Sequence, residues 1–335
     1  MININNIFDN TTDDKINNNS LYYIKKQIIG NSLLNLAINE DNKIIRYSNE
    51  WLSLIKIYYP NSGMYYNIVD LYNLIINNNN ITYIDKEVIP FVTSFSYGTV
   101  HGYCGLFYIL LEYINNKDKY ENYDIIVYKD SQRGLLDIID YLCDKNYIDR
   151  NKIIYVDGDI IYKFKSIHII SNDIHNYGND DITKNISNFI NNIWNNDKIG
   201  NKKVSIIKSS NSVNITSSGI INYYFVNNFN NKYNITYLEP GLINEIEVIN
   251  KINNCEIFVT TWGTAFFKNL VYISDKCKYI IVLVINDSWD FMTQYDSYVK
   301  NNNLINNFRN AKILYNVIDN NLNVNNQTIE NILNE

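Results

Sequence analysis

The segment that decides the fold is Cys255-Glu256-Ile257-Phe258-Val259-Thr260-Thr261-Trp262-Gly263-Thr264-Ala265-Phe266. It begins as a short apolar run typical of a buried strand, and continues through a hydroxyl-rich turn into a helical pattern. Ligands of open α/β sheets bind beyond the carboxyl ends of strands. Gly263 lets the backbone approach a ligand closely, and free N–H groups at a helix start attract phosphate oxygens. The alternative is that Thr264 only caps a helix that packs on the sheet, and the spacing leaves both interpretations open.

Around this segment, short apolar strands alternate with helices through the second half of the chain. Strands are predicted over 204–208, 235–238, 256–260 and 279–285, and helices over 220–225, 242–252 and 265–272. The same alternation occurs earlier, with strands over 88–92, 123–128, 152–156 and 167–170, and helices over 105–114, 131–145 and 181–194. This pattern is typical of parallel βαβ units. We therefore predict an α/β fold of two Rossmann-like domains.

The domain boundaries follow from where the alternation stops and restarts. Residues 1–20 are polar and predicted to be poorly ordered, and 21–195 form the first α/β domain. The polar stretch 195–201 is the predicted linker, and 202–288 form the second α/β domain. Residues 289–335 are predicted to be mostly helical and to pack back on the first domain.

Composition limits the kinds of partner. The chain has 335 residues, 46% of them hydrophobic and 19% charged, so each half can form a core. A net charge of −6 argues against nucleic acid as the main partner, because phosphate backbones require a basic surface. No apolar stretch has the length of a membrane span, the start does not resemble a signal peptide, and we expect a cytoplasmic protein. The excess of Asn, Ile and Tyr indicates an AT-rich genome, cellular or viral.

Three further places carry polar residues suited to chemistry. Lys208 and Ser209 leave a predicted strand end and suit a diphosphate; the alternative is a solvated polar loop. His101 lies in a glycine-rich loop before a helix, where it can act as a general base or be structural. Asp157 and Asp159 flank Gly158 and can hold a divalent cation, or form a plain hairpin turn. His168, in a predicted strand, is expected to serve in packing.

Taken in order, these places resemble glycosyltransferase family 61, from about Phe91 to Ile285. His101 matches the loop histidine of the family, and Lys208 matches the basic end of the first strand of its second domain. The matching blocks are Tyr237-Leu238-Glu239-Pro240 with Asn244-Glu245, the strand and turn Asn254 to Thr264, and Asn269-Leu270-Val271-Tyr272. Two departures stand out: Trp262 occupies the position of a family histidine, and Lys208 stands where arginines are expected.

The resemblance implies a GT-B-like fold, with two Rossmann-like domains facing a cleft. It implies an inverting glycosyltransferase that moves a sugar from a nucleotide-sugar, a UDP-sugar by preference, to a hydroxyl of a glycan or glycoprotein. The implied catalytic base is His101 or, failing it, Asp157. The implied donor-binding residues are Lys208, Ser209, Tyr237, Glu239, Thr260, Thr261, Trp262, Gly263, Thr264 and Asn269. No metal is required, although Asp157 and Asp159 leave a Mn²⁺ or Mg²⁺ ion open.

Two other functions remain alternatives. A degenerate, non-catalytic member of the same fold would bind glycans or support assembly, and the two departures favour it. A pyruvyl or phospho-group transferase acting on polysaccharide would need clustered arginines, and this chain has few.

Overall fold

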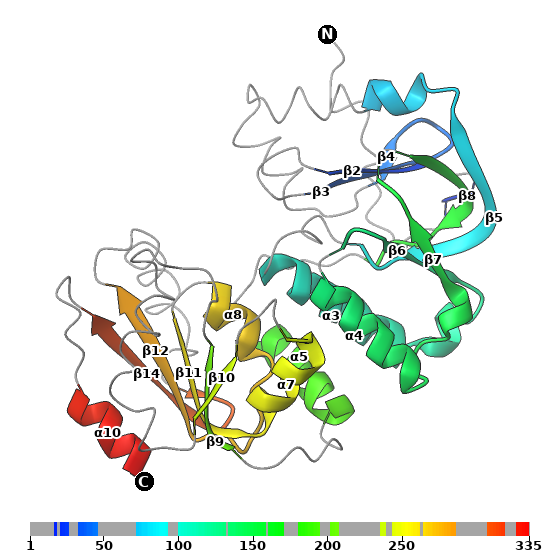
Figure 1. Ribbon diagram of the computed structural model, residues 1–335. Coiled ribbons are helices and arrows are strands. Elements are labelled where there is room, and N and C mark those ends of the chain that lie inside the picture. Colours follow the sequence, from blue (N-terminus) through cyan, green and yellow to red (C-terminus); the bar gives the residue numbers. More distant parts are fainter. Residues whose placement is uncertain are drawn as a thin grey trace. The chain divides into compact units, whose positions relative to one another are not determined.

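The computed structural model divides the chain into two compact units, Met1–His175 and Asn176–Glu335. Each unit is described here by itself (Figure 1). The structure describes residues 17–18, 21–26, 33–45, 72–92, 100–131, 133–158, 160–170, 180–194, 202–207, 235–238, 243–261, 264–285, 307–318 and 326–334.

The first unit is built on one mixed sheet with strand order β4-β3-β2-β8-β5-β6-β7, and β1 pairs with β8. Strands β8, β5, β6 and β7 run parallel, whereas β1 to β4 add an antiparallel edge. The strands are β1 (Asn17–Asn18), β2 (Leu21–Lys26), β3 (Leu33–Ile38), β4 (Ile44–Ile45), β5 (Ile81–Pro90), β6 (Asp124–Tyr128), β7 (Ile153–Val156) and β8 (Ile161–Ile167). The antiparallel edge comes from residues that show no clear strand pattern in the sequence.

Two helices connect the parallel strands, as parallel pairing requires. They are α3 (Val100–Asn115), between β5 and β6, and α4 (Arg133–Asp144), between β6 and β7. Short 3₁₀ turns follow each of them, at Lys117–Tyr120 and Arg150–Lys152. The buried face of α4 carries Leu135, Ile138, Ile139, Leu142 and Cys143, at the spacing typical of an amphipathic helix.

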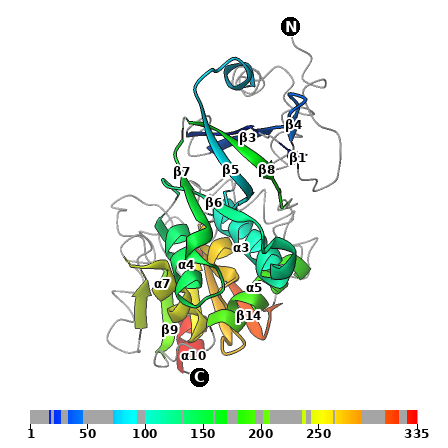
Figure 2. The ribbon, with the colours of Figure 1, turned by 90° about the vertical axis from the view of Figure 1, so that its right-hand side faces the viewer.

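Strand β5 is long and curved, as Figures 1 and 2 show. Its pairing with β8 shifts register between Ile84 and Glu87, which is the signature of a bulge and bends a strand. Its second half pairs with β6, so this strand joins the two parts of the sheet. One buried cluster joins side chains of β3, β5, β6, β7 and β8 with residues that follow these strands: Ala37, Val88, Val92, Ile126, Tyr128, Val156, Tyr162, Phe164, Ile167 and Ile169.

The second unit has a sheet with order β10-β9-β11-β12-β14-β13. All described pairings are parallel except that of β13 with β14. The strands are β9 (Lys202–Ile207), β10 (Ile235–Leu238), β11 (Cys255–Thr261), β12 (Tyr279–Ile285), β13 (Asn307–Phe308) and β14 (Ala311–Ile318). Counted along the chain, the five parallel strands follow the order 2-1-3-4-5, which is one of the orders of doubly wound sheets.

Helices cover both faces of this sheet (Figure 1). On one face, α10 (Asn326–Asn334) packs Ile329, Ile332 and Leu333 against side chains of β9, β11 and β12. On the other, the Ser205 hydroxyl of β9 donates to the Lys251 carbonyl of α7 (Glu245–Asn253) at 3.0 Å. Helix α8 (Thr264–Leu270) contacts α7, and α5 (Asp180–Trp194) contacts α7 as well.

The α/β class is therefore confirmed, but the prediction that residues 289–335 are mostly helical is wrong for their described part. That part begins with β13 and β14, which extend the second sheet, and α10 packs on the same sheet. The run Ala311–Ile318 is rich in β-branched and aliphatic residues, so it suits a buried parallel strand. A predicted strand over 167–170 is also misplaced, because β8 ends at Ile167. Among the described residues, no helix combines the length and apolar character needed to cross a membrane.

Candidate functional site

The carboxyl ends of three neighbouring strands lie level in the second sheet. Register pairs Ile207 of β9 with Leu238 of β10, and Ile206 of β9 with Val259 of β11. Between β9 and β11 the direction of winding reverses, because the chain passes from β9 to β10 on one side and returns to β11 on the other. Such a switch point opens a crevice at the carboxyl edge, where ligands of doubly wound sheets bind.

The predicted donor-binding residues all belong to these three strands or to segments that directly follow them. Lys208 and Ser209 follow β9, Glu239 follows β10, and Trp262 and Gly263 follow β11; these five lie outside the described residues. Their attachment points are described, and the strand order places those points next to one another. The topology thus brings together three groups that are separated by up to about fifty residues in the sequence.

The threonines of the turn that the structure describes belong to β11 or to α8. Thr260 and Thr261 are buried in β11, and the Thr260 hydroxyl donates to the Thr261 carbonyl at 3.4 Å. Thr264 is the first residue of α8. Asn269 is buried in α8 and donates from Nδ2 to the Ala265 carbonyl at 2.6 Å, which is a helix-internal contact. Thr260 and Asn269 thus form hydrogen bonds within their own segments.

Tyr237 lies near the end of β10 and is half-buried. Its ring packs against the apolar cluster that α10 covers. Burial raises the pKa of its phenol, which therefore stays protonated at neutral pH. The ring of Tyr237 therefore lies on the face of the sheet that α10 covers. Its predicted role in donor binding stays a prediction.

A buried ion pair joins the two helices that begin at this edge. Lys268 Nζ of α8 lies 2.9 Å from both carboxylate oxygens of Glu245, in the first turn of α7. Tyr272 donates its hydroxyl to Glu245 Oε1 at 3.0 Å. The two charged side chains are only 9% and 5% exposed, so neither charge has much access to water. This arrangement fixes α8, and with it the turn before α8, relative to α7.

The predicted catalytic residues follow parallel strands of the first sheet. His101 is the second residue of α3, and its side chain lies outside the described residues. Asp157 follows β7, where its carboxylate pairs with Lys129 Nζ at 2.9 Å and its N–H donates to the Tyr162 hydroxyl at 2.9 Å. The hydrogen bond that Lys129 donates to Asp157 raises the pKa of Lys129.

The loop after β7 is not the plain hairpin that was one interpretation of Asp157-Gly158-Asp159. Strand β7 pairs with β6, and β8 pairs with β5, so the loop connects strands that are not neighbours. Asp159 lies outside the described residues. Among the residues that the structure does describe, no group of three or more His, Cys, Asp or Glu side chains could hold a metal ion.

The predicted packing role of His168 is confirmed, although this residue lies just beyond the end of β8. It is buried, and its ring centroid lies 5.3 Å from that of Tyr120 and 5.7 Å from that of Tyr123.

Sequence reasoning did not name Lys129 or Lys268, and it named Glu245 and Tyr272 only as parts of matching blocks, without these contacts. The pairs they form span 28, 23 and 27 residues of chain, and no local spacing marks them. One signal was present for Glu245, since Asn244 precedes it as a helix cap and accepts from the Ile246 N–H at 2.8 Å.

Comparison with known proteins does not assign the chain to a group: no protein-family model matches it, and no curated protein matches it.

Proposed function

We propose that this protein is an inverting glycosyltransferase that binds a nucleotide-sugar at the carboxyl edge of the second sheet. One observation carries the proposal. The reversal of winding between β9 and β11 lies where the Lys208-Ser209 segment and the Thr260–Thr264 turn leave the sheet. A crevice of this kind suits a diphosphate flanked by a cation, hydroxyls and free backbone amides. The sugar-donor part of the proposal rests on the sequence resemblance.

The proposed chemistry is a direct displacement at the anomeric carbon. The acceptor hydroxyl attacks the carbon from the face opposite the diphosphate, and the diphosphate leaves with its bonding electron pair. Lys208, Ser209 and the backbone amides of Gly263 and Thr264 stabilise the negative charge that develops on the leaving group. A base in the first unit takes the hydroxyl proton.

His101 is the better of the two proposed bases. The Asp157 carboxylate is already engaged in an ion pair, with Lys129 Nζ 2.9 Å from its Oδ2 atom. An imidazole titrates near neutral pH and can hold the proton during the transfer. We include in the proposal two Rossmann-like domains, with acceptor recognition assigned to the first; the parallel strands of both sheets support it.

A ligand-binding test examines the donor site directly. We expect UDP or a UDP-sugar to raise the melting temperature of the full chain in a nucleotide-sugar panel, with and without Mn²⁺. A ligand present at about 100 times its Kd contributes about 2.7 kcal/mol to stability. Lys208→Ala should lose this shift. Lys203→Ala, on the same strand toward its opposite end, should keep it.

The outcomes separate enzyme from binding protein. No shift with any nucleotide would remove the proposed donor site. A shift without turnover, unaffected by His101→Ala, would instead favour the non-catalytic alternative, in which Trp262 and Lys208 replace residues that the activity needs. Turnover that His101→Ala lowers by at least about 100-fold would support the proposed base.

A further inference from the structure

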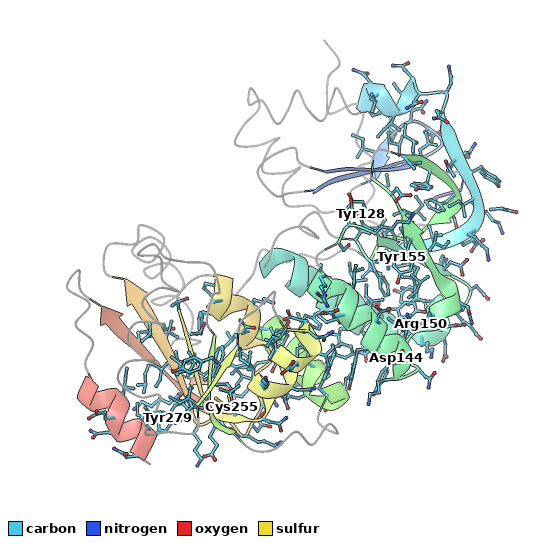
Figure 3. All side chains as sticks on the ribbon, viewed as in Figure 1. Tyr128, Asp144, Arg150, Tyr155, Cys255 and Tyr279 are labelled. Atoms are coloured by element: carbon cyan, nitrogen blue, oxygen red, sulfur yellow. The ribbon has the colours of Figure 1, made fainter. Side chains whose placement is uncertain are left out.

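Two cysteines face each other at the amino ends of β11 and β12, opposite the edge discussed above. Register pairs Ile257 of β11 with Tyr279 of β12. The pairing continues toward the amino ends, because the Lys278 N–H donates to the Glu256 carbonyl at 2.7 Å. Two residues before the Ile257–Tyr279 pair stand Cys255 and Cys277. Figure 3 marks this end of the second sheet with the labels Cys255 and Tyr279.

The two cysteines are therefore neighbours across the pairing of β11 with β12. Cys255 Sγ donates to the Ile252 carbonyl at 3.1 Å, and Cys277 Sγ donates to the Tyr279 carbonyl at 3.3 Å. The residues are 0% and 1% exposed, so both thiols are buried.

Cys277 also lines a hollow in the surface of the second unit. The hollow has a volume of about 380 Å³, and its wall includes Tyr279, Lys312 and Ile332. A small oxidant such as hydrogen peroxide fits a space of this size easily, because a water molecule occupies only about 30 Å³ of liquid. Cys277 therefore belongs to the wall of this hollow, and Cys255 is not among the residues that line it.

We propose that Cys255 and Cys277 are a thiol-oxidation site, which a small hydroperoxide closes to a reversible disulfide in the folded protein. Neighbouring strands of a sheet are about 4.8 Å apart, and disulfides form at Cα separations of about 4.4–6.8 Å. The bond therefore needs no large movement of the backbone. This inference is independent of the proposed transferase activity.

The reaction balances in two steps. The Cys277 sulfur attacks hydrogen peroxide and the O–O bond breaks, which leaves a sulfenic acid on Cys277 and releases water. The Cys255 sulfur then attacks the Cys277 sulfur, the S–O bond breaks, and the departing hydroxide takes the Cys255 proton as a second water. Two thiols and one peroxide thus give one disulfide and two waters.

Burial favours this assignment of the two steps. It raises the pKa of the Cys255 thiol well above the usual range and so disfavours its thiolate, which leaves the first attack on the peroxide to Cys277. Cys143 is similar in burial but lies in the other unit. It is buried in α4 of the first unit, and burial raises the pKa of its thiol as well.

The test uses the reduced full chain, folded, treated with hydrogen peroxide and then alkylated in denaturant. We expect the number of alkylated thiols to fall from four to about two, with the original number restored by dithiothreitol. Peptide mapping without reduction should find Cys255 linked to Cys277. The unmodified chain gives this result alone, so the test stands even if a cysteine variant folds poorly.

Two variants provide matched controls. Cys143→Ser should still lose about two alkylated thiols, whereas Cys277→Ser should lose none. The proposal is overturned if all four thiols stay reactive, if Cys277 goes on to a sulfinic acid without linking, or if the bond formed contains Cys104 or Cys143.

Discussion

At the scale of single residues, Gly158 shows how a close approach dictates a residue type. A Cβ atom at this position would lie 2.8 Å from the Tyr128 hydroxyl oxygen and 3.3 Å from a ring carbon of Tyr128. The first distance is shorter than any normal contact, and Tyr128 is itself buried. Since Tyr128 also belongs to the buried cluster of the first sheet, its ring has little room to retreat. Glycine is therefore required here for space.

We predict that Gly158→Ala lowers the free energy of unfolding by about 1–3 kcal/mol, because overpacking forces neighbouring atoms apart. Tyr128→Phe removes the hydroxyl oxygen that would lie 2.8 Å from the new Cβ atom. In a Tyr128→Phe protein, Gly158→Ala should therefore lower the free energy of unfolding by less. Urea unfolding of the two single variants and the double variant measures the coupling. Gly134→Ala, in helix α4, is the control, and should be neutral or stabilising by up to about 1 kcal/mol. Equal losses in both backgrounds would contradict the steric explanation.

At the scale of elements, the buried pair Lys268–Glu245 couples α8 to α7. Exchange of one partner leaves the other charge without compensation in a site that excludes water. A matched pair exists on the surface of the same unit: Lys278 and Glu256 also lie 2.9 Å apart, but their side chains are 65% and 42% exposed. The two ion pairs therefore have the same N···O distance and differ in burial.

We predict that Glu245→Gln destabilises the protein by about 3–5 kcal/mol, whereas Glu256→Gln costs about 0–1 kcal/mol. Lys268→Met combined with Glu245→Gln should recover part of the loss, because no buried charge remains. Chemical denaturation of the four proteins provides the comparison. Similar costs for the two single glutamine variants would show that burial does not strengthen the Lys268–Glu245 interaction.

At the scale of the whole molecule, the division lies before α5 and not after it. The sequence placed α5 in the first domain, but its contacts lie in the second unit. Asn253 of α7 donates to Asn191 at 2.7 Å, and Ser187 donates to the Ile273 carbonyl at 3.1 Å. Arg309, before β14, donates to Ser187 at 3.0 Å and pairs with Asp275, whose pKa it lowers.

We predict that a fragment of residues 176–335 unfolds cooperatively, because it contains α5 together with the complete second sheet. A fragment of residues 202–335 should lose stability, since it lacks the polar contacts of α5 and the buried side chains of Ile190 and Trp194. Urea titrations followed by circular dichroism compare them. Equal stability of the two fragments would place the folding boundary at the polar stretch 195–201 instead.

The sequence by itself determined the elements whose pattern is local. Helix α4 and strands β6, β7, β11 and β12 lie close to their predicted positions, because each apolar run or amphipathic face is complete within its own segment. The sequence also located the turn after β11 and the Lys208 segment as strand-end features. Those predictions needed only the period of the side chains and the turn residues.

Only the tertiary structure decided which strands are neighbours, and therefore which strand ends meet. The strand β14, the antiparallel edge of the first sheet, the partner of α5 and the Lys268–Glu245 pair all depend on contacts between distant segments. A run such as Ala311–Ile318 suits either a buried helix or a strand, and its place beside β12 selects the strand. Propensity acts over a few residues, whereas strand order is set by burial across the whole unit. The site at the β9–β11 reversal follows from that order.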